Sequence, residues 1–224
     1  MKGSVVQTLI LSDWHRHRFP IFFCVASGAL ALAMIQVGGE LLFILGTTWF
    51  FTGMIVFGCM LPTSNVINER KKQTLPFLMS LPLSVTQFTA AKLVSTFGIF
   101  FVPWLTLVIA AIAFIAGHKG IPHGVIPITI VLSMFPLVGF CLNAGVAIVG
   151  ESEGAMIAAM VATNSSYGFC WYLLARNPAI RANMQSPGIV WSKEILSVLG
   201  FEFAVIVLIL GLTFYLQSRK RDFV

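Results

Sequence analysis

Long apolar runs, separated by short polar segments, fill most of the 224-residue chain. Six of these runs approach the roughly 20 residues that an α-helix needs to cross the hydrocarbon core of a bilayer. They lie at about residues 20–37, 41–61, 88–117, 125–149, 155–174 and 195–216. Because a single spanning segment has to satisfy its own backbone hydrogen bonds, each run is expected to be helical. The pattern predicts an all-α polytopic membrane protein, with six transmembrane helices in one domain over residues 1–224.

The residues before the first run, 1–19, form an amphipathic pattern that is too polar to span. Val5, Leu9 and Trp14 recur at helical spacing, and Asp13 is among the polar residues between them. This favours a helix that lies in the cytoplasmic membrane interface with Trp14 at headgroup depth. The alternative is a disordered tail.

Two further segments affect how the runs are arranged. The fifth run carries a small-residue face that favours close helix packing, at Ala155, Ala158, Ala159 and Ala162. The loop at 175–194 mixes prolines with apolar residues such as Ile180 and Trp191. It is either a plain extracytoplasmic loop or a pair of short interfacial or re-entrant helices.

Composition and charge agree with a lipid environment. Only 10% of the residues are charged and the mean hydropathy is +0.92, whereas soluble domains carry roughly 25% charged residues. In a soluble protein the net charge of +6 would suggest nucleic acid, but here the basic residues cluster at the ends of apolar runs. If the N-terminus is cytoplasmic, ten of the 14 Lys and Arg residues lie inside, and Lys119, Arg176, Arg181 and Lys193 lie outside. The positive-inside rule therefore places both termini in the cytoplasm and makes a nucleic-acid partner unnecessary.

Between the second and third runs, residues 65–92 combine charge, proline and apolar side chains. Asn68 and the charged residues 69–72 come first, and an apolar group around Phe77 follows, interrupted by Pro76. We expect a short helix that lies along the membrane, and we expect Lys92 to extend its amine to the interface. The alternative is an ordinary basic cytoplasmic loop.

This stretch resembles the pattern shared by permease subunits of type-2 ABC transporters. The resemblance lies in ERKKQTL at 69–75, FLMSLPLS at 77–84 and the downstream Ala91-Lys92, and it departs at Gln73, where Gly is common, and at Pro76. The resemblance implies that residues 68–84 are the coupling helix, which docks on a separate ATPase. The residues implied in coupling are Asn68, Glu69, Arg70, Lys71, Leu75, Phe77, Leu78 and Leu81.

The same resemblance implies a function. The chain would be the permease subunit of an ATP-driven exporter in the bacterial inner membrane, working by alternating access with two ATPase subunits and a second copy or a homologous permease. No G-x-x-x-x-G-K-[ST] motif occurs in the sequence, so we expect ATP and Mg²⁺ on the partner chain and no cofactor on this one. The alternative is an integral membrane enzyme or assembly factor that acts on a lipid without an ATPase. The substrate stays open between peptide, drug, lipid, ion and polysaccharide.

Candidate chemistry inside the chain is sparse. The motifs H-E-x-x-H and G-x-S-x-G are absent, and His118 and His123 have no carboxylate or Cys near them in sequence, so we expect neither a catalytic nor a metal site. Glu202 is the only acid clearly inside an apolar run. Because a buried acid at that depth is costly, we assign Glu202, with Asn143 and Asn164, to a transport path or gate. The alternative is a structural role in holding helices together.

Overall fold

The described chain is a bundle of long helices. The computed structural model describes residues 2–67, 85–118, 120–150 and 152–219. The elements are α1 (Lys2–Val37), α2 (Glu40–Pro62), the π-helix η1 (Thr63–Ile67), α5 (Val85–Gly117), α6 (Val125–Gly150), α7 (Glu153–Arg176), α8 (Pro178–Met184) and α9 (Lys193–Arg219). No described residue is in a strand, so the prediction of an all-helical fold is confirmed for this part of the chain.

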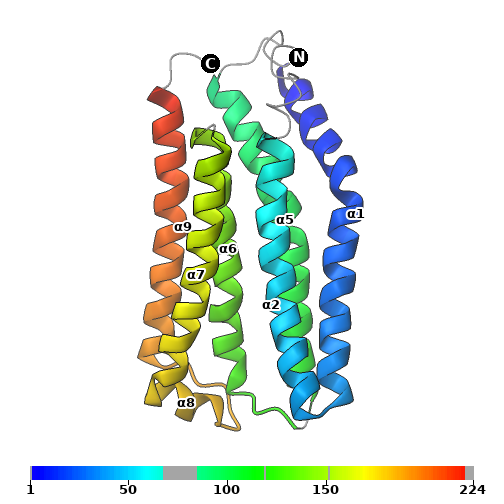
Figure 1. The fold of residues 1–224 in the computed structure, drawn as a ribbon, viewed down its shortest axis with the longest axis vertical. Helices are drawn as coiled ribbons and strands as arrows, with labels where there is room; N and C mark the ends of the chain where they lie inside the picture. Colours follow the sequence, from blue (N-terminus) through cyan, green and yellow to red (C-terminus); the bar gives the residue numbers. More distant parts are fainter. Residues whose placement is uncertain (1, 68–84, 119, 151, 220–224) are drawn as a thin grey trace.

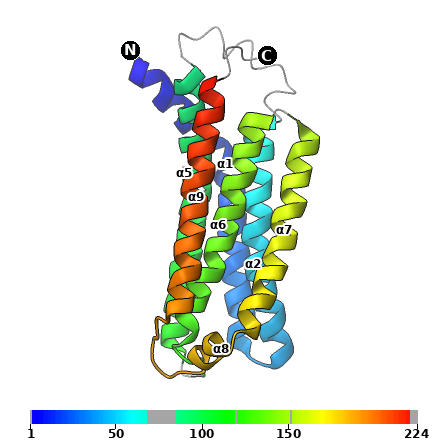
Figure 2. The ribbon, with the colours of Figure 1, turned by 90° about the vertical axis from the view of Figure 1, so that its left-hand side faces the viewer.

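The long helices run side by side, and the short helix α8 lies at one end of the bundle (Figure 1). At the opposite end, α1 begins, α9 ends, and the two segments that flank residues 68–84 also end (Figures 1 and 2). The loop predicted at 175–194 contains α8, which Asn177 caps by accepting a hydrogen bond from the backbone N–H of Ala179.

Five helices in the described residues are long and apolar enough to cross a membrane. They cover Leu11–Val37, Glu40–Asn65, Lys92–Gly117, Val125–Gly150 and Lys193–Arg219. The predicted fifth span at 155–174 does form a helix, α7, of 24 residues. However, α7 is less apolar than the others, because Asn164, Ser165 and Ser166 interrupt it. The structure therefore supports a helical membrane protein, and the sixth span stays a prediction.

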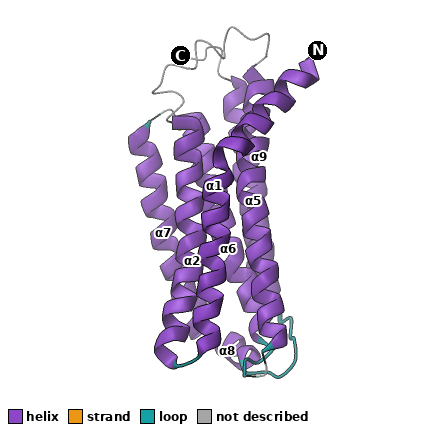
Figure 3. Ribbon diagram, turned by 90° about the vertical axis from the view of Figure 1, so that its right-hand side faces the viewer, coloured by secondary structure: helices purple, strands orange, loops and turns teal. Residues whose placement is uncertain are grey.

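The first helix differs from the expectation of a separate interfacial helix and span. α1 continues without interruption from Lys2 to Val37 and contains Pro20. Its first turns lean away from the bundle (Figures 2 and 3). The boundary that we predicted at residues 19 and 20 thus lies within one helix, and an interfacial position for residues 1–19 stays a prediction. At the other end of α1, Gly38 and Gly39 make the turn into α2 with φ angles of 86° and 92°, which favour glycine.

Aromatic side chains fill the core between α2, α5 and α6. The rings of Phe100 and Phe140 stack with centroids 4.3 Å apart, and Phe57 stacks on Phe100 at 6.0 Å. The Trp104 indole N–H donates to the carbonyl of Ser133 at 2.6 Å, which links α5 to α6. The central helix is α6, which packs against α2, α5, α7 and α9. Most side chains of α7 face outward, and only Met156 and Leu174 are buried.

Candidate functional site

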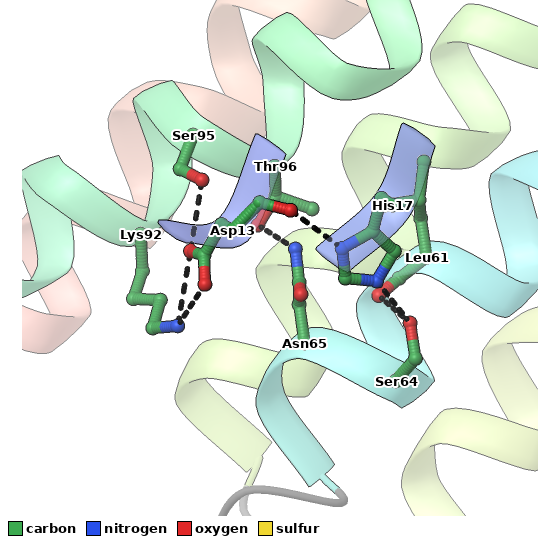
Figure 4. Close-up of polar contacts among 8 residues, drawn as sticks. All are labelled: Asp13, His17, Leu61, Ser64, Asn65, Lys92, Ser95 and Thr96. Carbon is green, nitrogen blue, oxygen red and sulfur yellow. Dashed lines mark hydrogen bonds and ion pairs between the residues drawn. The ribbon is translucent and has the colours of Figure 1, made fainter. Parts of the chain in front are cut away.

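The predicted coupling residues lie outside the described part of the chain, but the segments on either side of them are described. The eight residues concerned are Asn68, Glu69, Arg70, Lys71, Leu75, Phe77, Leu78 and Leu81. Before them the chain ends in η1, and after them it continues as α5. Polar side chains from both flanks meet those of α1 in a group that we call the polar cluster (Figure 4). Its buried members are Asp13, His17, Asn65, Lys92, Ser95 and Thr96, and Ser64 is half-buried.

An ion pair joins α1 to α5 at the centre of this cluster. Lys92 Nζ lies 3.1 Å from Asp13 Oδ2 and 3.4 Å from Oδ1. The Ser95 hydroxyl donates to the same Oδ2 at 2.8 Å. Lys92 is only 6% exposed and Asp13 only 4%. The carboxylate therefore accepts from two donors of α5 away from water, which is the arrangement that a buried charge requires.

A second contact joins α1 to η1. His17, one helical turn beyond Asp13, lies 2.9 Å through Nδ1 from the main-chain carbonyl of Asp13. Because a carbonyl only accepts, Nδ1 carries a proton. The other nitrogen, Nε2, lies 3.1 Å from the hydroxyl of Ser64. The imidazole is thus held in one orientation between its own helix and η1.

A third contact closes the cluster between η1 and α5. Asn65, which is fully buried, donates through Nδ2 to the Thr96 hydroxyl at 3.3 Å. Together with the other two contacts, it makes a closed triangle of α1, η1 and α5 (Figure 4). Residues 68–84 therefore connect two segments that are bonded to each other and to α1.

The position of Lys92 corrects our prediction that its amine extends to the membrane interface. The side chain points instead to Asp13 and is buried. The physical reason is that the Asp13 carboxylate of α1 lies 3.1 Å from the amine. Water is excluded from this site, so that the opposite charge stabilises the amine more strongly than the membrane interface would. Sequence reasoning also missed the other members of the cluster.

A signal for Asp13 and His17 was nevertheless present in the sequence. The buried residues of α1 lie along one stripe, which consists of Asp13, His17, Cys24, Gly28 and Ala31. Continuing the inward face of the first span back toward the N-terminus, at spacings of three, four and seven residues, would have included both polar residues.

One of the three predicted path residues lines a groove between α2 and α7, and a second lies buried behind it. Asn164 of α7 lines a hollow of about 550 Å³ together with Cys59 of α2. Asn143 of α6 is buried behind it and donates through Nδ2 to Cys59 Sγ at 3.5 Å. Ser64 of the polar cluster also lines this hollow.

The groove continues along α2 toward the end of the bundle that carries α8. A second hollow, of about 660 Å³, shares Thr52 and Ile55 with the first. It contains no charged residue, and its walls are mostly apolar and aromatic, including Tyr167 and Trp171 of α7. Tyr167 contacts Phe51 of α2 with ring centroids 6.0 Å apart. Together the two hollows follow α2 over most of its length.

Glu202 lies apart from both the groove and the polar cluster. It is 3% exposed, on the stripe of α9 that also carries Ile195, Ile206, Thr213 and Gln217. Neither carboxylate oxygen has a hydrogen-bond partner among the described residues. The prediction of a buried acid within a helix is confirmed, whereas a role in transport stays a prediction. No group of three or more His, Cys, Asp or Glu residues in the described ranges could hold a metal ion.

Comparison of the chain with protein-family models, with curated proteins and with solved structures finds no match. The resemblance to type-2 ABC permeases therefore rests on the sequence motif at 69–92 alone, and membership of that family stays a prediction.

Proposed function

We propose that the chain is the permease subunit of an ATP-driven transporter of the type-2 ABC exporter class, in a bacterial inner membrane. The observation that carries the proposal is the polar cluster, which ties both flanks of residues 68–84 to the helical bundle. A segment that is displaced by a soluble ATPase can transmit the displacement to the helical bundle only if it is rigidly attached to that bundle. Buried, hydrogen-bonded contacts at both flanks meet that requirement, and a solvated basic loop has no need of them.

In this proposal the ATPase is a separate polypeptide, two copies of which bind ATP and Mg²⁺. Their closure on ATP moves residues 68–84, and the bundle switches between inward and outward access. Type-2 ABC permeases work in pairs, and the outward face of α7 is consistent with a second copy or a homologous permease. Ala155, Ala158 and Ala162 of the small-residue face are exposed, and so are the polar side chains of Asn164 and Ser165. Lipid tails offer no hydrogen bonds to such groups, whereas another protein chain or a water-filled path does.

The groove between α2 and α7 suits the path of the substrate. It connects the polar cluster, through Ser64, with the largely apolar hollow toward α8. Asn164 supplies an amide group along it, and Ser64 and Thr63 supply hydroxyl groups, so that a molecule with both apolar and polar parts would find partners.

The experiment that tests the proposal is purification of the chain from its native membrane in mild detergent, followed by identification of the bound proteins. We expect a P-loop ATPase in equal amount with the permease. Phe77→Asp combined with Leu78→Asp should release the ATPase, because burial worth about 1.5–3 kcal/mol per side chain is lost and charge is added. Glu69→Ala combined with Arg70→Ala should keep the ATPase bound and lower ATP turnover, because exposed ion pairs contribute about 0–1 kcal/mol.

The matched control is Ile189→Asp combined with Val190→Asp. Both residues are exposed, in the loop between α8 and α9 at the opposite end of the bundle, and this change should leave the ATPase bound. If the Phe77 and Leu78 variant retains the ATPase and normal ATP turnover, residues 68–84 are only a basic loop. Recovery of the wild-type chain without an ATPase, but with a lipid-converting activity, would favour the membrane enzyme instead.

A further inference from the structure

The three contacts of the polar cluster form a closed triangle of α1, η1 and α5. A closed triangle restricts the relative motion of three segments more than a single bond between two of them does. If α1 were bonded to α5 alone, η1 could still pivot. With bonds from α1 to α5, from α1 to η1 and from η1 to α5, none of the three segments can move relative to the other two without breaking one of these contacts. Two of the contacts are buried, and the one between His17 and Ser64 is partly buried. The N-terminal part of α1 is therefore fixed to both ends of residues 68–84, although it is distant from them in sequence.

Stability alone does not explain why an ion pair lies at this buried position. Moving a carboxylate and an amine out of water is costly, and apolar residues of the same size are often as stabilising. What a buried pair does provide is a defined partner and register, since either charge alone is strongly unfavourable in that place. Asp13 and Lys92 thus specify where α1 and α5 must sit relative to each other.

We propose that Asp13 and Lys92 are positioning residues that make α1, η1 and the first turns of α5 move as one unit. The inference rests on the proposed function in one respect, because it gives α1 a share in the motion delivered to residues 68–84. It extends that function by assigning the N-terminal helix to the moving part rather than to a passive anchor. The ion pair acts through the position of the helices and contacts no substrate.

Amide hydrogen exchange of the full chain in lipid nanodiscs tests the unit directly and needs no ATPase. In Lys92→Met we expect exchange to quicken by about tenfold or more in residues 11–17 of α1 and in η1, as well as in the first turns of α5. The outer half of α9 should be unchanged. Arg176→Met at the opposite end of the bundle is the control for loss of a cation, and it should leave all three segments protected. Faster exchange confined to α5 would overturn the proposal.

A double variant separates positioning from stability. Asp13→Asn combined with Lys92→Met removes both charges, so no uncompensated charge stays buried and the amount of inserted protein should return toward wild type. The unit should nevertheless stay loosened, and the complex should hydrolyse ATP at an altered rate with the ATPase still bound. Wild-type exchange and ATP turnover in the double variant would show that the pair is only structural. If wild-type protein binds no ATPase, the proposed function fails, while the exchange measurement still decides whether the three segments form one unit.

Discussion

At the scale of single residues, Glu202 poses the sharpest question. A carboxyl group that is 3% exposed, with no partner among the described residues, is unfavourable in a membrane helix unless it has a task. Its neighbours along the same stripe, Ile195 and Ile206, are apolar. No partner among the described residues therefore explains why an acid stands at this position.

Glu202→Gln keeps the shape of the side chain and removes the ionisable group. In the proposed complex with an ATPase, we expect ATP turnover to fall several-fold, with the amount of inserted chain almost unchanged. The measurement is ATP hydrolysis per copy of the chain in the purified complex. Glu194→Gln, at the exposed start of the same helix, is the control and should behave as wild type. Normal turnover in Glu202→Gln would assign the residue a structural role.

Residue-level reasoning from sequence correctly expected Glu202 to be buried, because a lone acid within an apolar run usually faces protein or a water-filled cavity. It failed for Lys92, because the nearest apolar neighbours in sequence say nothing about a carboxylate 79 positions away. Asn164, which we predicted in a transport path, is exposed on α7 and lines the groove, and its role stays a prediction. Side-chain partners across the bundle were thus the part that could not be predicted.

At the scale of helices, the contact between α1 and α2 depends on a glycine. A Cβ atom on Gly46 would lie 2.8 Å from the Ala31 carbonyl oxygen and 2.7 Å from Ile35 Cγ1. Gly53, on the same helix, has only Ser27 Oγ nearby, at 3.6 Å. The two glycines therefore form a matched pair for testing how closely these helices pack.

Gly46→Ala should destabilise the chain by about 1–3 kcal/mol, the usual cost of overpacking. For a chain of this length, each kcal/mol lowers the melting temperature by about 2–4 °C. Gly53→Ala should leave the melting temperature unchanged or raise it, because alanine is the better helix former. Thermal unfolding of the purified chain in detergent measures both. Equal melting temperatures for the two variants would mean that α1 and α2 can separate at little cost.

The positions of the helices could be predicted from the lengths of the apolar runs. The surroundings of α7 and the continuity of α1 could not. The run at 155–174 gave a full-length helix whose outward face carries polar groups, so its environment depends on what covers α7. We predicted a boundary between residues 19 and 20, yet α1 continues through Pro20. Proline removes one backbone hydrogen bond, and the packing of a long helix can compensate for that loss.

At the scale of the whole molecule, the start of α1 and the end of α9 lie at the same end of the bundle, opposite α8 (Figure 1). This arrangement agrees with an even number of crossings. It also places the described flanks of residues 68–84 at the end of the bundle where α1 begins. This is the end that we predicted to be cytoplasmic, because most of the basic residues belong to it.

Reporter fusions test the orientation. A reporter after Val224 should be cytoplasmic, and one inserted after Pro187, in the exposed loop next to α8, should be on the outer side. The physical reason is the asymmetry of Lys and Arg between the two ends. A reporter whose activity depends on compartment, such as alkaline phosphatase, gives the readout. Activity on the same side for both fusions would contradict six crossings.

The ion pair between Asp13 and Lys92 also constrains how the protein is made. The two residues are 79 positions apart. At a synthesis rate of about 5–20 residues per second, Asp13 emerges from the ribosome roughly 4–16 s before its partner. During that interval we expect its carboxylate to stay in water at the membrane surface, so that α1 reaches its final depth only when α5 arrives. We therefore expect insertion of the N-terminal helix to be completed late, by a segment translated long after it.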